Sequence, residues 1–94
     1  MAIENSILIR DSKGKEIVEG AQIKVGDVMF SGQTKPGSEV HVFDNGQSRF
    51  SSQAASDHSI GKVLIPFKEG SHTVTTKFEY LDEEKTLSFI VVSD

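Results

Sequence analysis

Apolar and polar residues alternate along most of this chain with a period of two, rather than with the 3.6-residue period of a helix. The clearest run spans residues 39–43, where Val40 and Val42 point to one side and the intervening polar residue points to the other. Residues 63–67 and 74–80 alternate in the same way. The pattern predicts β-strands that each bury one face.

Turn residues separate these runs. Asn45 and Gly46 both accept a positive φ, and Asn-Gly between two alternating runs predicts a tight β-hairpin whose return strand covers residues 47–53. Pro36 and Gly37 predict a second turn, because proline fixes φ and glycine accepts the left-handed region. Pro66 lies inside an apolar run, so that run is expected at a sheet edge or a strand end.

About seven short strands, with turns at intervals of about 8–12 residues, predict an all-β, immunoglobulin-like antiparallel β-sandwich. A short apolar segment lies around Ile17 and Val18, and the last strand is expected over residues 86–92. No segment is predicted to form a helix, since Gly20 interrupts the nearest candidate, residues 15–24. The predicted core consists of Phe30, Val40, Val42, Val63, Ile65, Val74, Phe78, Leu87, Phe89 and Val91.

The composition narrows the possible functions. Ninety-four residues (1–94) suit one domain, and without cysteine or tryptophan any immunoglobulin-like core must use aliphatic residues and phenylalanine. The net charge of −4 is spread along the chain, which argues against nucleic acid and anionic membranes as partners. No apolar run approaches the roughly 20 residues that span a bilayer. The first ten residues do not resemble a signal peptide, so if the natural protein is exported, this chain is expected to be a fragment of it.

Neither catalysis nor a resident cofactor is expected. The three histidines, His41, His58 and His72, show no metal-ligand spacing, and His72 is expected to offer a ring nitrogen to a loop carbonyl. No Gly-x-Ser-x-Gly motif is present to hold a nucleophilic serine, so the chain is predicted not to be an enzyme.

Calcium is kept as an alternative ligand. The predicted hairpin tip carries Asp82, Glu83 and Glu84, and other loops are expected to hold Asp27, Asp44 and Asp57. Calcium takes six to eight oxygen ligands and could use such loops between consecutive modules. No Asp-x-Asp-x-Asp-Gly loop occurs, however, and a charged tip commonly serves solubility.

Several segments together resemble one known family. "IRDSKGKEI", "VMFSGQTKPGSEVHVFDNG", "EGSHTVTTKFEY" and "LSFIVV" follow one another in the order of the bacterial immunoglobulin-like (Big-type) repeats of large surface and secreted proteins. The chain departs from that pattern at Val63, where the family usually has tryptophan. The strand after Asn45-Gly46 lacks the usual glycine, and "YLDEEKT" replaces a common Asp-x-x-Gly-Asn loop.

The resemblance implies a non-catalytic spacer of a larger exported bacterial surface or adhesin-like protein. Such modules are joined head to tail as tandem repeats outside the cell, so neighbouring domains of the same polypeptide are the expected partners and the isolated domain is expected to be a monomer. An odd number of antiparallel strands would place the chain ends at opposite poles, as a rod segment requires. The alternative is a module that binds a carbohydrate or a host protein, with Phe43, Phe50 and Tyr80 as the aromatic residues outside the predicted core.

Overall fold

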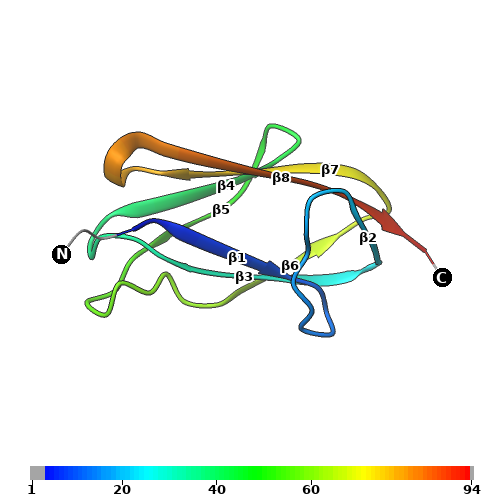
Figure 1. The fold of residues 1–94 in the computed structure, drawn as a ribbon, viewed down its shortest axis with the longest axis horizontal. Helices are drawn as coiled ribbons and strands as arrows, with labels where there is room; N and C mark the ends of the chain where they lie inside the picture. The colour runs from blue at the N-terminus through cyan, green and yellow to red at the C-terminus, as the bar shows by residue number, and fades with distance from the viewer. Residues whose placement is uncertain (1–3, 94) are drawn as a thin grey trace.

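The computed structural model describes residues 4–93 and is an all-β sandwich of two stacked sheets (Figure 1). The strands are β1 (Ser6–Arg10), β2 (Ala21–Lys24), β3 (Gly26–Gln33), β4 (Glu39–Asp44), β5 (Gln47–Gln53), β6 (Val63–Phe67), β7 (Gly70–Phe78) and β8 (Glu83–Val92). One single-turn 3-10 segment, η1 (Tyr80–Asp82), joins β7 to β8. The predicted fold class is confirmed, with eight strands in place of about seven.

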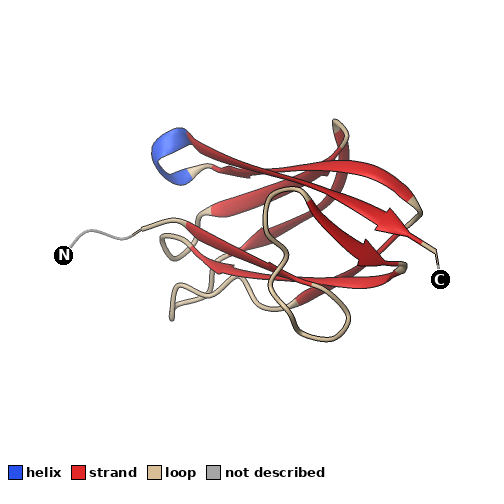
Figure 2. Ribbon diagram, turned by 45° about the vertical axis from the view of Figure 1, so that its right-hand side comes forward, coloured by secondary structure: helices blue, strands red, loops and turns tan. Residues whose placement is uncertain are grey.

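The two sheets have three and five strands, in the orders β1-β3-β6 and β2-β8-β7-β4-β5. Figure 2 shows them as two layers of strands with the loops at their ends. Every pairing is antiparallel except that of β2 with β8, which is parallel. β6 lies at an edge of the smaller sheet, as Pro66 predicted, because proline has no backbone N–H to give to a further strand.

The additional strand is β2, which the pattern did not predict. The short segment around Ile17, which precedes β2, lies outside the named strands, but Ile17 is buried and its N–H donates to the Ile9 carbonyl at 2.9 Å. β2 has only four residues and one buried side chain, Ile23, which is too little for alternation to be visible. β1 and β2 run in the same direction, one in each sheet, so together they cross the molecule once (Figure 1). Eight strands therefore leave the ends at opposite poles, as seven would.

The molecule is elongated, with extents of 44 × 24 × 20 Å. β1 begins near one end of the long axis, and β8 finishes at the other (Figure 1). Below, the end at which β1 begins is called the entry pole, and the end at which β8 finishes is called the exit pole.

The core lies between the sheets. Of the predicted core residues, Phe30, Val40, Val42, Val74, Phe78, Phe89 and Val91 are buried, whereas Val63, Ile65 and Leu87 are half-buried and pack against the buried ones. The buried set also includes Ile9, Ile17, Ile23, Val28, Ala54, Ile60 and Phe67. Phe67 stacks with Phe30 and contacts Phe89, so phenylalanine fills the centre that tryptophan and a disulfide fill in antibody domains.

The β4–β5 hairpin forms as predicted, with positive φ at Asn45 (51°) and Gly46 (82°). A β-bulge interrupts its register, because Val42 pairs with Phe50 whereas Phe43 pairs with Ser48. The bulge reverses which side of β5 faces the core, since one extra residue shifts the period of two. Phe50 therefore packs edge-on against Phe30 with ring centroids 5.2 Å apart, half-buried against the core, although it is not among the predicted core residues.

One further predicted turn forms, and the last strand begins earlier than predicted. Gly37 has a φ of 86°, which suits glycine, and its N–H donates to the Ala54 carbonyl at 3.0 Å, so the predicted Pro36-Gly37 turn is anchored to the end of β5. The last strand begins at Glu83 rather than at Thr86, because the connection from β7 tightens into η1.

Candidate functional site

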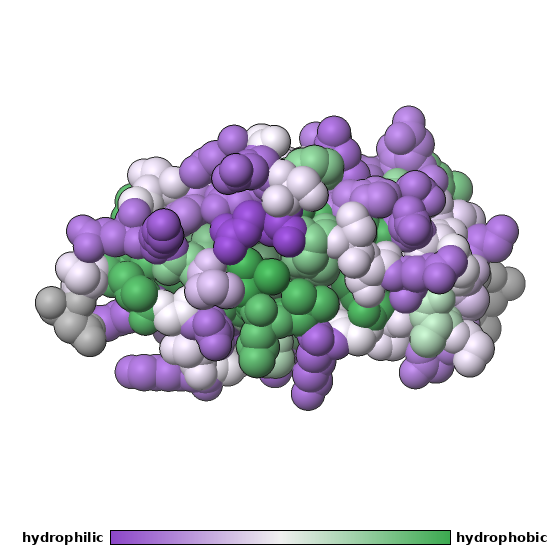
Figure 3. All heavy atoms as spheres, turned by 180° about the vertical axis from the view of Figure 1, so that it is seen from behind, coloured by the Kyte–Doolittle hydropathy of each residue, from purple (hydrophilic) through white to green (hydrophobic). Residues whose placement is uncertain are grey.

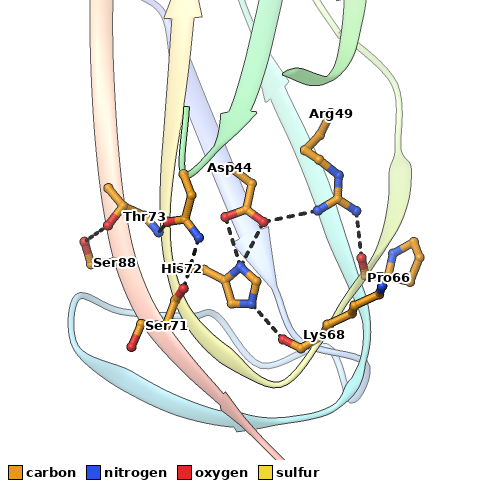
Figure 4. A network of polar contacts seen from close by, with 9 residues as sticks. Asp44, Arg49, Pro66, Lys68, Ser71, His72, Thr73 and Ser88 are labelled. Atoms are coloured by element: carbon orange, nitrogen blue, oxygen red, sulfur yellow. Dashed lines mark hydrogen bonds and ion pairs between the residues drawn. The ribbon is translucent and has the colours of Figure 1, made fainter. Parts of the chain in front are cut away.

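A buried polar network joins the two sheets toward the exit pole (Figure 4). His72 on β7 contacts both carboxylate oxygens of Asp44 through Nδ1, at 2.9 and 2.8 Å, and the Lys68 carbonyl through Nε2 at 2.7 Å. The expectation that a His72 ring nitrogen meets a loop carbonyl is confirmed. Carboxylates and carbonyls only accept hydrogen bonds, so each ring nitrogen of His72 faces an acceptor.

Arg49, the bulged residue of β5, extends this network to the smaller sheet. Its Nη1 donates to Asp44 at 3.2 Å and its Nη2 donates to the Pro66 carbonyl on β6 at 2.8 Å (Figure 4). Its guanidinium also lies over the Phe67 ring, 4.9 Å from the centroid. Asp44 is therefore a buried strand residue that contacts both His72 and Arg49, and the expectation that it is a loop residue is wrong.

A second network holds the entry pole. The buried Asn5 side chain donates through Nδ2 to the Tyr80 carbonyl and to the Glu83 carboxylate, both at 2.8 Å. Thr34 donates its hydroxyl to Asn5 Oδ1 at 2.6 Å, and Lys85 Nζ donates to the Asn5 carbonyl at 3.0 Å. The chain is thus fixed to the start of β8 just before it enters β1.

The parallel pair β2–β8 holds the opposite end of the last strand. Its register runs from Ala21–Phe89 to Lys24–Val92. Two further hydrogen bonds flank the pair: the Gly20 N–H donates to the Ser88 carbonyl at 2.8 Å, and the Val25 N–H donates to the Val92 carbonyl at 3.0 Å. The β8 strand is consequently tied to the first part of the chain near both of its ends.

The three histidines lie in separate places. His72 is in the buried network, and His58 is in the loop between β5 and β6 with a φ of 75°. His41 is on the outer face of β4, where its Nε2 lies 3.2 Å from Glu79 and 3.5 Å from Glu39. Sequence spacing did not indicate this cluster, because Glu79 comes from the end of a different strand.

The predicted acidic tip does not form a comparable cluster. Within residues 4–93, the one group of three histidine or acidic side chains close enough to share an ion is Glu39, His41 and Glu79. Glu83 instead accepts a hydrogen bond from Asn5.

The aromatic residues considered for ligand binding do not form one surface. Phe43 lies under the Lys77 ammonium at 5.2 Å, and Tyr80 lies under the Lys35 ammonium at 5.7 Å. Phe50 is half-buried and packs against the core. Binding faces usually gather aromatic anchors, so this arrangement does not favour the alternative of a carbohydrate- or protein-binding module.

The surface carries hollows among its described residues. One hollow of about 210 Å³ is lined mainly by apolar side chains from β1, β7 and β8, with Glu16 and Lys85 as its charged residues. Figure 3 shows hydrophilic side chains over most of one face, around a central apolar area. The large exposed apolar side chains Val18, Val25, Leu64, Leu81 and Ile90 come from separate segments.

No model of a known protein family, no curated protein and no solved structure matches this chain. Within the described part of the chain, none of the helical segments has the length and apolar character needed to cross a membrane.

Proposed function

We propose that this domain is a non-catalytic spacer module of a larger exported bacterial surface or adhesin-like protein, joined head to tail with similar domains. The resemblance to the bacterial immunoglobulin-like repeats supports the proposed family and the proposed location. The observation that carries it is the path of the chain, which enters at one pole of a 44 Å sandwich and leaves at the other.

This path supports the proposal because it decides how tension acts on the fold. A pull on the two chain ends acts along the long axis, and the strands run along that axis (Figure 1). Hydrogen bonds between strands lie across the strand direction, so such a pull loads the bonds of each terminal strand together, in shear. A pull across the strands would open the same bonds one after another.

The contacts at the two poles support the same role. The β2–β8 pair and its two flanking hydrogen bonds resist sliding of the last strand toward the exit pole. The Asn5 network resists withdrawal of the chain at the entry pole. A spacer needs both ends held in this way, because tension reaches it through its first and last residues.

Single-molecule stretching tests the mechanical part of the proposal. In a tandem array pulled through its natural chain ends, each domain is expected to unfold in a single step at high force. The matched control attaches one handle at Gln47→Cys, beside the β4–β5 turn, and the other at the carboxyl end, so that the pull crosses the strands. The chain contains no other cysteine, which makes this attachment unique. Equal unfolding forces in the two geometries would remove the mechanical support.

The full reading frame from which the chain comes tests the proposed family and location. We expect it to encode an export signal and further copies of the domain at intervals close to its own length. A reading frame that encodes this domain alone, or beside a cytoplasmic enzyme, would count decisively against the spacer function.

A further inference from the structure

A cluster of three metal-ligand side chains lies on the outer face of the five-stranded sheet. Glu39 and His41 are two residues apart on β4, so they point to the same side of the sheet. Glu79 directly follows β7, the neighbour of β4, and its N–H donates to the Glu39 carbonyl at 3.1 Å. Strand pairing therefore brings two carboxylates and one imidazole together from residues far apart in sequence.

The spacing of the three side chains suits a small divalent cation. Zinc bonds of about 2.0–2.1 Å at tetrahedral angles place neighbouring ligand atoms about 3.3 Å apart. His41 Nε2 lies 3.2 Å from Glu79 Oε2 and 3.5 Å from Glu39 Oε2. The ligand atoms of all three residues lie within 4.8 Å of one another, and both glutamates are exposed.

The other ring nitrogen of His41 has the partner that a metal-binding histidine needs. Nδ1 lies 2.7 Å from the Ser51 hydroxyl on the adjacent strand β5. When Nδ1–H donates to Ser51, the lone pair of Nε2 faces the two carboxylates, which fixes the tautomer and the orientation of the ring.

The surroundings leave the cluster open to an ion. Lys77 lies across from His41 on β7, but its ammonium is placed over the Phe43 ring, 5.2 Å from the centroid. The side chains of His41, Glu39 and Glu79 are 30%, 48% and 56% exposed, so water can complete the coordination.

We propose that Glu39, His41 and Glu79 bind a Zn²⁺ ion on the outer face of the five-stranded sheet. The imidazole selects zinc over calcium and magnesium, which prefer oxygen ligands. Without the ion, the same side chains form a surface polar contact in which His41 lies between two glutamates. The site is independent of the spacer function, because none of its residues belongs to either polar network at the poles.

Titration with ZnCl₂ distinguishes the zinc-bound cluster from the ion-free contact. The protein is prepared without a histidine tag. Calorimetry is expected to show one ion per chain, and NMR is expected to show saturable shifts confined to Glu39, His41, Ser51 and Glu79. CaCl₂ is expected to leave these signals unchanged. Absence of a localised response to zinc at millimolar concentration, or an equal response to calcium, would overturn the proposal.

Variants assign the ligands. His41→Ala and Glu79→Gln are each expected to weaken zinc binding at least tenfold, and Ser51→Ala roughly tenfold through loss of the orienting hydrogen bond. The matched control is His58→Asn, which removes another accessible imidazole and keeps a residue that tolerates the positive φ at that position. Zinc affinity that is unchanged in His41→Ala, or that falls equally in His58→Asn, would show that the cluster is not the site. Thermal melts are expected to show that all four variants remain folded, because the altered side chains are not in the core.

Discussion

At the scale of single residues, the most consequential side chain is Asp44. It is buried, yet it contacts His72 and Arg49 and so joins β4, β5 and β7 at one point. Arg49 then reaches the Pro66 carbonyl in the other sheet. A buried charge is tolerated only where its partners satisfy it, so this network resists change more strongly than a surface ion pair does.

Replacement of Asp44 by alanine tests this view. The change leaves His72 and Arg49 without their shared acceptor, and we expect a loss of about 3–5 kcal/mol in the free energy of unfolding. The matched control is Asp27→Ala on an exposed position of β3, which is expected to change stability by less than about 0.5 kcal/mol. Urea denaturation measures both values. Similar stability of the two variants would mean that the network contributes no more than surface charge.

Gly32 has an equally specific role, because the paired strand β1 leaves no room for a side chain beside it. A Cβ at this position would collide with the Ser6 carbonyl oxygen and would lie 3.2 Å from Ile7 Cα. Since both atoms belong to the backbone, they cannot move aside cheaply, and Gly32→Ala is expected to destabilise the domain by about 1–3 kcal/mol. Gly26→Ala in the same strand would meet only the Ser12 side chain, at 3.3 Å, and is expected to cost clearly less. An equal loss in the two melting curves would contradict the close approach.

At the scale of elements, the β-bulge in β5 decides whether the Phe50 ring points toward the core or away from it. Period-two alternation counted from the turn places Phe50 outside, and one inserted residue turns it inward. The predicted core omits Phe50, although the two strands and their turn lie where the pattern predicts them. A single-residue register shift leaves no mark in a pattern of apolar and polar positions.

Alanine replacements separate the two faces of this hairpin. Phe50→Ala removes a ring that packs against Phe30, and we expect a loss of about 2 kcal/mol or more in unfolding free energy. Phe43→Ala removes an outward ring whose described contact is with Lys77, and we expect a loss below about 1 kcal/mol. The reverse order of the two losses in chemical denaturation would mean that the bulge is absent in solution.

The sequence predicted most of the elements because a strand with one buried face reveals itself by alternation. It did not predict β2, since four residues with one buried side chain show no period. It also did not predict the Glu39–His41–Glu79 cluster, because the pairing of β4 with β7 is a long-range feature. The contact of His72 with the Lys68 carbonyl could, by contrast, be predicted from the sequence, because the two residues are only four positions apart in the chain.

At the scale of the whole molecule, the separation of the first and last strands predicts the length of an array of joined copies. Two domains joined directly are expected to form an extended particle whose longest dimension is close to twice 44 Å. Small-angle X-ray scattering of one copy and of two joined copies measures this increment, and a compact two-domain particle would contradict the expected rod. The same samples are expected to remain monomeric and to give no signal on a glycan array.

The distance between the first and last strands also limits how the chain can be rearranged. Many domains have neighbouring termini, which is why their ends can be fused or the whole domain inserted into a loop of another protein. Closing this chain on itself would need a linker of roughly a dozen fully extended residues to span about 44 Å. Insertion into a host loop would force the two sides of that loop apart by a similar distance. The domain is therefore suited to a position between two other domains in a linear chain. It is unsuited to circular permutation and to insertion into a loop of another domain.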